Sequence, residues 1–492
     1  MKKIFVLFLA LTMILPLCAC SSSLDPAATK AEEAKTEEKA PEKAPAAEDN
    51  KPDQFNISED LPEGFAVGYA IGDITSTPIS MYNATAESVH DPLQLTCIAI
   101  SDGEGNVALV MTADLKGLNR DVFERSTDII QKNFGIPAEN VMISATHTHS
   151  APTVNAGSDT NMTRFRSKYY QQLPIIVEEA LRDLDEIESC YTGKGTAKSI
   201  AFVRRYLQPD GSYITHGNKS SVKHETDADP ELRTIRFDRK NKKDVLMVNY
   251  QTHYGGATGM YPAQLSADFV APFRDAAEKE LDCLFAYYSG AGGNINFNSP
   301  IPGEKIYATF LDAIPEFMRA TNMALDAEKE AQVGTIRSAF AWHTQAIRKD
   351  PPERVAQAKE VVDAGRETTE GKTLIGKYGF LNKYEPTSIV ARNTTYGATE
   401  DVPLSAIAFG DIAFTAFPYE MFDTNGKECR DASPYDMTFV LSLAGGGYGY
   451  IPSAFAYPHG GYEVSICRFT EGCGEAFVAT MLNLLNQCKA GA

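Results

Sequence analysis

The feature that most constrains the fold is a repeated change between strand-like and helix-like spacing of apolar residues. Apolar runs at 96–101 and 107–112 flank a short Gly-rich turn, which predicts a β-hairpin. Amphipathic spacing then predicts a helix at 120–134, and an apolar run at 140–144 predicts a buried strand. Alternation of this kind is typical of α/β proteins, so we expect mixed β-sheets layered with helices.

The same patterns continue to the end of the chain. No internal repeat or break in composition interrupts them, which favours a single large domain over residues 61–492. Further helices are expected at 168–184, 269–281, 352–364 and 474–487, and further strands at 234–237, 245–250, 283–288, 407–414 and 437–443.

The first twenty residues have the composition of a targeting segment. After two lysines, an apolar run at 4–16 is too short to span a bilayer. It ends at 17–20 in Leu-Cys-Ala-Cys, which is similar to bacterial lipoprotein signals. We therefore expect a signal peptide at 1–19 and a lipid on Cys20 that anchors the protein to a bacterial cell membrane, outside the cytoplasm. An ordinary signal peptide cut nearby is the alternative.

Residues 20–60 form the next compositional segment. They are rich in Ala, Glu, Lys and Pro and nearly lack aromatic side chains. Such a segment cannot bury enough apolar surface to offset the entropy of ordering, so we expect a disordered, charged tether.

Composition limits the classes of protein that fit. The chain has 65 acidic residues against 46 Lys and Arg, for a formal net charge of −19. Nucleic-acid binding requires a basic face, so no nucleic-acid partner is expected. The cysteines after Cys20 show no CxxC spacing, so disulfides are not expected to define the fold. A Cys467–Cys473 bridge and buried free thiols both stay open.

Histidines follow two of the expected strands. His147 and His149 come directly after the strand at 140–144, and in an extended chain their side chains would face the same way. His253 follows the strand at 245–250. A single strand-end histidine is more often structural, but two such places in one chain favour a metal centre. Catalytic Zn²⁺ typically takes three protein ligands and keeps an open position for water.

Several segments resemble the neutral/alkaline (non-lysosomal) ceramidase family. The string 144–152, Ser-Ala-Thr-His-Thr-His-Ser-Ala-Pro, resembles the family's signature. Other segments agree in order, and together they span about residues 64–487: 67–75 with its Gly-Asp-Ile-Thr turn, 90–93, 114–118, 417–420, 449–452 and 461–463. The family's extra C-terminal sandwich domain is not expected, because the chain ends near the last family helix.

The resemblance implies roles for seven residues. A zinc site of two His, one Glu and one Tyr would consist of His147, His253, Glu420 and Tyr450. Three further residues would act on the substrate: His149 beside the metal, Tyr462 as a hydrogen-bond donor to the developing oxyanion, and Arg204 as an anchor for polar groups.

The segment at 292–298 departs from the family pattern at two positions. Asn296 occupies the place of an active-site Ser, and Asn294 replaces an Asp. An amide cannot serve as a hydroxyl nucleophile, but it can donate a hydrogen bond to an oxyanion. We therefore expect residues 61–492 to be a zinc hydrolase domain that cleaves the amide of a small-molecule or lipid-like N-acyl substrate. The alternatives are a zinc esterase and a lipid-anchored binding protein on a catalytically decayed scaffold.

Overall fold

A computed structural model describes residues 55–81, 84–253, 255–447 and 449–491. The expected signal peptide, Cys20 and the tether as far as residue 54 lie outside these described residues. The last part of the expected tether is structured. Phe55 is buried in a hydrophobic core that also contains Leu95 and Leu109, and helix α1 (Ile57–Asp60) follows it. Phe55 supplies the apolar surface that the preceding residues lack.

The larger sheet has nine strands. Its main path runs β18-β16-β15-β10-β1-β5-β6-β8, with β20 paired to β10. The expected hairpin is present as β5 and β6, whereas β6–β8 and β16–β18 are parallel pairs. The strands are β1 (Ala66–Asp73), β5 (Gln94–Ser101), β6 (Val107–Ala113), β8 (Val141–Ala145), β10 (Asp185–Thr196), β15 (Glu231–Arg239), β16 (Val245–Tyr250), β18 (Leu284–Ser289) and β20 (Lys329–Glu330).

The smaller sheet has the order β21-β22-β23-β25, and β23–β25 is again a parallel pair. Its strands are β21 (Arg337–Ala346), β22 (Thr399–Phe409), β23 (Ile412–Phe417) and β25 (Met437–Ser442). The single strand expected at 407–414 is wrong, because the chain reverses at Gly410, whose φ is +55°. Glycine adopts this conformation easily, and a Cβ there would lie 1.9 Å from the carbonyl oxygen of Gln332.

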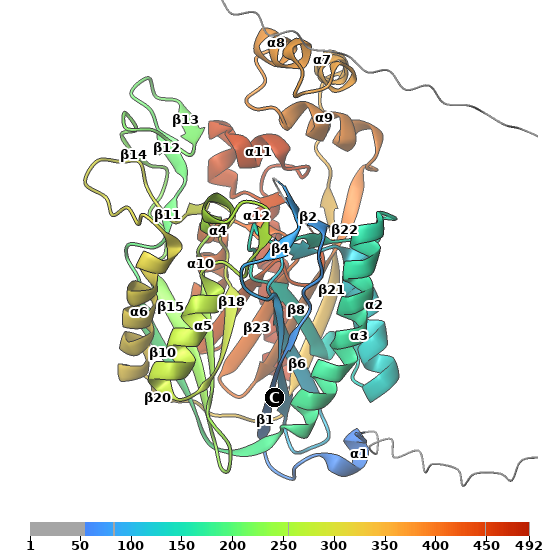
Figure 1. Ribbon diagram of the computed structural model, residues 1–492, viewed down its shortest axis with the longest axis vertical. Coiled ribbons are helices and arrows are strands. Elements are labelled where there is room, and N and C mark those ends of the chain that lie inside the picture. The colour runs from blue at the N-terminus through green and yellow to red at the C-terminus, as the bar shows by residue number, and fades with distance from the viewer. Residues whose placement is uncertain (1–54, 82–83, 254, 448, 492) are drawn as a thin grey trace, which may run out of the picture. The chain divides into compact units, whose positions relative to one another are not determined.

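The two sheets stack face to face, and helices cover their outer faces (Figure 1). Alternate residues of β5 show the layering, since Cys97 packs toward the helices and Ile98 toward the second sheet. The expected α/β class with mixed sheets and helix layers is confirmed. The larger sheet is covered by α2 (Arg120–Phe134), α3 (Thr160–Arg182), α5 (Val270–Leu281) and α6 (Ile314–Asp326), and the smaller by α10 (Asp423–Asp431) and α12 (Cys473–Ala490).

Helix α3 begins earlier than its apolar spacing indicates. The expected start was residue 168, but the helix starts at Thr160. The side chain of Asp159 accepts a hydrogen bond from the backbone N–H of Met162, which caps the helix and satisfies one of its free donors. Phe165 then continues the buried face toward the N-terminus.

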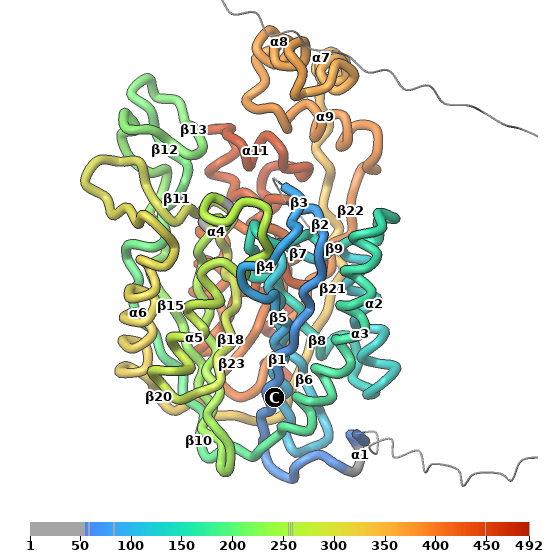
Figure 2. The backbone as a smooth tube through the Cα atoms, in the orientation of Figure 1, coloured from blue at the N-terminus to red at the C-terminus, as the bar shows by residue number. Residues whose placement is uncertain are grey.

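Two insertions lie at one end of the sheets (Figures 1 and 2). One, between β10 and β15, contains short strands; the other, between β21 and β22, contains three helices. Within the part of the chain that the structure describes, no helix has the length and apolar composition needed to cross a bilayer. The insertion elements are β11 (Phe202–Val203), β12 (Arg205–Leu207), β13 (Tyr213–Thr215), β14 (Lys223–His224), α7 (Pro352–Ala364), α8 (Thr369–Lys377) and α9 (Glu385–Thr394).

Candidate metal centre

The four expected ligands all follow the carboxyl ends of strands that belong to parallel pairs. His147 follows β8, and His253 follows β16. Glu420 follows β23 and opens the short strand β24 (Glu420–Met421), while Tyr450 follows β25 and opens β26 (Tyr450–Ile451). In open α/β sheets such carboxyl ends are where ligands bind.

The ends of the two sheets are joined by backbone hydrogen bonds. The N–H of Ala145 donates to the carbonyl of Leu443 at 3.3 Å, and the N–H of Gly445 donates to that of Ile143 at 3.3 Å. Strand β8, at the edge of the larger sheet, is thereby fixed against the segment that follows β25 of the smaller sheet. Residues more than 270 positions apart in the chain therefore meet at one point.

The backbone holds His147 in an unusual conformation. Its φ is +65°, in the left-handed region that residues other than Gly rarely adopt. Its N–H donates to the carbonyl of Leu115 at 2.9 Å, and its Nδ1 lies 2.8 Å from the carbonyl oxygen of Lys116. A carbonyl can only accept, so Nδ1 is a donor and Nε2 is the ring nitrogen that remains for a metal. Strain of this kind is concentrated at functional sites.

Three imidazole nitrogens converge on one point. Nε2 of His149 lies 3.3 Å from Nε2 of His147 and 3.1 Å from Nε2 of His253. A Zn–N bond of about 2.0–2.1 Å places neighbouring donors of a tetrahedral site about 3.3–3.4 Å apart. The spacing therefore suits a metal ion, and this buried cluster could hold one.

The charge state of the histidines also suits a metal. Burial, together with His147, Lys116 and Arg204, puts the pKa of His149 well below its ordinary value. Burial, Arg204 and the two other histidines do the same to the pKa of His253. Both rings are therefore neutral, which is the form that binds metals.

Glu420 and Tyr450 complete the surroundings of this point. Strands β24 and β26 pair in parallel with Glu420 opposite Tyr450. Oε2 of Glu420 lies 3.3 Å from Nε2 of His147 and 3.9 Å from Nδ1 of His253. This oxygen is buried and accepts no hydrogen bond from the described residues. A buried carboxylate oxygen in this state is costly, and a cation would satisfy it.

The carboxyl group of Glu420 is held in its ionised form. Burial alone would raise its pKa, but the neighbouring His147, Arg204 and Lys116 lower it below the ordinary value. A negative charge is thus available where a metal ion would need one. The donor set of imidazoles and a carboxylate fits Zn²⁺.

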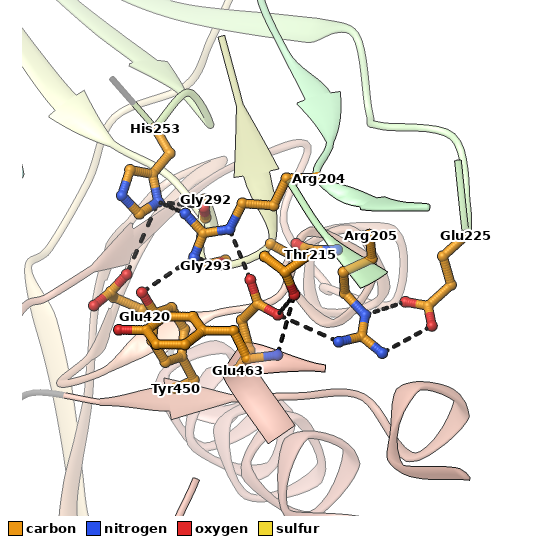
Figure 3. Close-up of polar contacts among 12 residues, drawn as sticks. Arg204, Arg205, Thr215, Glu225, His253, Gly292, Gly293, Glu420, Tyr450 and Glu463 are labelled. Atoms are coloured by element: carbon orange, nitrogen blue, oxygen red, sulfur yellow. Dashed lines mark hydrogen bonds and ion pairs between the residues drawn. The ribbon is translucent and has the colours of Figure 1, made fainter. Parts of the chain in front are cut away.

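Arg204 contacts two of the candidate metal ligands and links them to neighbouring parts of the chain (Figure 3). Its Nη2 donates to the carbonyl of Gly293 at 2.9 Å and to Oη of Tyr450 at 3.1 Å, and its Nη1 lies 3.3 Å from Nδ1 of His253. Its Nε donates to Oε1 of Glu463 at 2.7 Å. These contacts support a positioning role for Arg204. Its expected role as a substrate anchor stays a prediction.

All eight expected site residues line one cavity of about 820 Å³. His149 is the least buried of the three histidines. Tyr462 and Asn296 also line this cavity. The ring of Tyr462 packs edge-on against that of Tyr450, with centroids 5.7 Å apart. The structure thus brings all eight candidate site residues to one cavity, although their individual roles stay predictions.

The cavity also contains residues that the sequence did not single out. Lys116, Arg366 and Tyr384 line it, the last two from the helical insertion between β21 and β22. Lys116 lies in a segment that carried the family resemblance, but its side chain had no distinguishing pattern. Arg366 and Tyr384 lie on ordinary charged and amphipathic stretches, so no sequence signal marked them.

Comparisons with known proteins bear on the fold. No protein-family model matches the chain, and no curated protein matches its sequence. A crystal structure of neutral ceramidase from Pseudomonas aeruginosa matches 86% of this chain and 74% of its own, with a TM-score of 0.63 and 16% identity. A structure described as ceramidase complexed with C2 matches 87% of this chain and 76% of its own, with a TM-score of 0.64 and 15% identity. The resemblance in sequence motifs is therefore confirmed at the level of structure, and the chain has the fold of neutral ceramidase.

Proposed function

We propose that the protein is a zinc-dependent amidohydrolase that cleaves the linear amide of an N-acyl, ceramide-like substrate. The observation that carries this proposal is the convergence in one cavity of three imidazoles, two of them held neutral by their surroundings, and a buried carboxylate oxygen that accepts no hydrogen bond from the described residues. The fold of neutral ceramidase supports hydrolysis of an amide. A complex of a ceramidase with C2 among the similar structures supports a lipid-like substrate.

The ligands in this proposal are His147, His253, Glu420 and Tyr450. Glu420 supplies negative charge, and its pairing partner in β26 is Tyr450. Burial and Glu420 raise the pKa of Tyr450, whereas Arg204 lowers it, and a bound cation would lower it further. His149 faces the cavity more openly than the other two histidines, as expected of a residue that acts on the substrate.

The remaining residues have roles in proton transfer and charge stabilisation. Bound zinc would polarise the scissile carbonyl and lower the pKa of water. His149 is not a ligand in this proposal; its imidazole accepts a proton from the attacking water and passes it to the amine nitrogen as the C–N bond breaks. Tyr462 and Asn296 donate hydrogen bonds to the oxygen on which negative charge develops.

A second candidate function rests on Asn296. Its place in the ceramidase pattern belongs to Ser, so a binding protein on a decayed scaffold, or a zinc esterase, also accounts for the sequence. The full set of metal donors favours an enzyme, because a binding protein would not need to retain it. Cleavage of N-acyl lipids or N-acyl amino acids, with weaker cleavage of matched esters, would separate the three.

Metal analysis and hydrolysis together test the proposal. The purified protein should contain one zinc per chain and release fatty acid from N-acyl substrates. His147→Ala and His253→Ala should lose both the zinc and the hydrolysis. His343→Ala is the matched control, because His343 lies on β21 and contacts Oγ1 of Thr480 at 2.8 Å. Full activity in either site variant would overturn the proposal.

We also propose that a lipid on Cys20 anchors the protein outside the cytoplasm. The support is the Leu-Cys-Ala-Cys string at 17–20 and the polar composition of the residues that follow. Metabolic labelling with an alkyne fatty acid should mark the wild-type protein and leave Cys20→Ala unmarked. Equal labelling of both would contradict the anchor.

A further inference from the structure

We infer that Ser465 and Asn382 are positioning residues that hold Tyr462 in the cavity. The helical insertion between β21 and β22 (residues 347–398) is thereby part of the site. This inference rests on the proposed function, in which Tyr462 donates a hydrogen bond to the developing oxyanion. It deepens that proposal, because it says which contacts fix this donor.

Tyr462 lies on a helix that is too short to be stable by itself. It is the first residue of α11 (Tyr462–Ile466), which has five residues and no side-chain cap at its start. Isolated helices shorter than about 12–15 residues are marginal in water. The position of Tyr462 therefore depends on contacts with other segments. Thr215 of β13 accepts a hydrogen bond from the N–H of Tyr462 at 3.1 Å, and the helical insertion supplies further contacts.

A chain of hydrogen bonds joins the helical insertion to Tyr462. Nδ2 of Asn382 donates to Oγ of Ser465 at 2.8 Å, and this hydroxyl donates to the carbonyl of Tyr462 at 2.8 Å. Oδ1 of Asn382 accepts from the N–H groups of Tyr384 and Glu385 at 2.9 and 3.0 Å. Backbone N–H groups only donate and carbonyls only accept, so each bond has a fixed direction. The starts of α9 and α11 are thereby joined.

The insertion also holds the other end of α11, and α9 lies beside it (Figure 1). Nη1 of Arg392, on α9, donates to the carbonyl of Ser465 at 3.0 Å. Nη2 of Arg348 donates to the carbonyls of Val464 and Ser465 at 3.1 and 3.2 Å. Carbonyls in the last turn of a helix lack intrahelical partners, and positive charge there is favourable. The short helix is therefore held at both ends by one insertion.

The tyrosine rings pack along the same path. The ring of Tyr384 lies edge-on to that of Tyr462, with centroids 5.9 Å apart. The ring of Tyr462 lies edge-on to that of Tyr450, with centroids 5.7 Å apart. Edge-to-face pairs at such distances are favourable. The insertion thus holds both the backbone and the ring of Tyr462, next to a proposed metal ligand.

Ser465→Ala is the most direct test, because Ser465 is buried and does not line the cavity. Its effect on a substrate must pass through α11. The variant loses the link to Asn382 but keeps a residue that favours helix. We expect kcat on an N-acyl substrate to fall about tenfold to 100-fold, because small displacements of a transition-state donor are costly. KM should change little, since the lost contact is made in the transition state.

A double-mutant cycle tests whether the effect passes through Tyr462. Tyr462→Phe removes the proposed donor, so adding Ser465→Ala should cause little further loss of kcat. Thr368→Ala is the matched control. Thr368 caps α8 in the same insertion by accepting from the N–H of Gly371 at 3.0 Å, and none of its hydrogen bonds with described residues reaches α11. This variant should lose stability and keep the wild-type kcat.

A spectroscopic measurement separates this inference from the proposed function. 3-Fluorotyrosine in place of Tyr462 reports on the surroundings of the ring without any substrate. We expect Ser465→Ala and Asn382→Leu to shift or broaden its fluorine NMR signal, and Thr368→Ala to leave it unchanged. If no amide is cleaved, the proposed function fails, and this signal still decides the inference. An unchanged signal in both site variants would overturn the inference, as would an equal loss of kcat with and without Tyr462→Phe.

Discussion

Asn296 is the residue at which the cavity departs from the ceramidase pattern. It lies in the same cavity as the histidines, on strand β19 (Ile295–Asn296), where it pairs with Phe202 of β11. Its amide is larger than the Ser hydroxyl of the family and donates a hydrogen bond from a different place. We therefore expect residue 296 to affect substrate choice through the position of its hydrogen-bond donor as well as through the identity of its polar group.

Exchanging this residue should change the preferred substrate. We expect Asn296→Ser to raise cleavage of ceramide relative to N-acylglycine by about tenfold, because it restores the hydroxyl of the family. Asn296→Ala, which removes the donor, should lower kcat on both substrates by about 100-fold. Parallel kcat/KM measurements check both statements. An unchanged ratio in Asn296→Ser would show that specificity is set elsewhere.

Glu463 is the carboxylate on which the positioning of the ligands depends. It is fully buried and accepts hydrogen bonds from Arg204, Arg205 and Oγ1 of Thr215. Arg205 keeps a second partner in Glu225, at 2.6 and 3.0 Å, whereas Arg204 forms an ion pair with Glu463 alone among the described residues. Removing the charge of Glu463 would leave Arg204 buried and unbalanced.

Glu463→Gln should therefore lower both stability and metal affinity. The expected loss in the free energy of unfolding is about 3–5 kcal/mol, and zinc affinity should fall about tenfold to 100-fold, because Arg204 contacts His253 and Tyr450. Denaturant titration and competition with a chelator measure the two effects. Glu225→Gln, which contacts Arg205 but not Arg204, should lower stability with little change in zinc affinity.

The residues differ in how far the sequence could identify them. His147, His149 and His253 stand out because few histidines occur in the chain and these follow apolar strands. Glu420 is one of 65 acidic residues, and only the family resemblance selects it. Arg366 could not be found, because its position in the cavity depends on how the helical insertion folds over the sheets.

At the scale of elements, the loop after β18 positions strand β24. The N–H of Gly293 donates to the carbonyl of Met421 at 2.8 Å. A Cβ on residue 293 would lie 2.4 Å from the carbonyl oxygen of Glu420 and 2.8 Å from its carbonyl carbon. Only Gly allows the loop to approach the ligand-bearing strand this closely.

Gly293→Ala should therefore disturb the metal centre. The added methyl would push β24 away from the loop, and we expect zinc affinity to fall at least about tenfold. Gly376→Ala is the control, because Gly376 lies in helix α8 with open space around its Cβ position. It should leave zinc affinity unchanged. Chelator competition on the folded proteins gives the comparison, and wild-type affinity in Gly293→Ala would contradict the proposed contact.

Most elements could be predicted because their patterns are local. The strands at β8 and β16 are apolar runs of the expected length, and α2 has a regular apolar face. The start of α3 depended on a cap at Asp159, and the β22–β23 hairpin on one Gly within a long apolar run. The stacking of two sheets and the joining of their ends could not be predicted, since they depend on pairings between distant segments.

At the scale of the molecule, Asp423 joins a helix on the smaller sheet to a segment that leads into the larger sheet. It opens α10, which packs on the smaller sheet, and its N–H donates to Oδ1 of Asn294 at 2.8 Å. Its Oδ2 accepts from the N–H of Asp229, in the segment before β15 of the larger sheet. Its Oδ1 is buried and has no hydrogen-bond partner among the described residues.

The charge state of this carboxyl should affect the stability of the whole fold. The pKa of Asp423 is raised from its ordinary 3.8 to about 6. Burial is the largest cause and the charge of Asp229 adds to it, whereas Arg430, the Asp229 N–H and Arg233 lower the pKa. Between these two values the folded protein binds more protons than the unfolded chain. Stability from this group is therefore greatest in acid and falls as pH rises from about 4 to about 6.

Comparison of Asp423→Asn with the wild type isolates this effect. The variant is neutral at every pH, so its advantage should be absent near pH 4 and reach at most about 3 kcal/mol near pH 7. Asp229 has a lowered pKa, and its contribution is lost only as pH falls below about 4, outside this window. Denaturant titrations from pH 4 to 7 at fixed ionic strength measure the difference in unfolding free energy. A difference that does not change with pH would mean that Asp423 does not titrate in the folded protein.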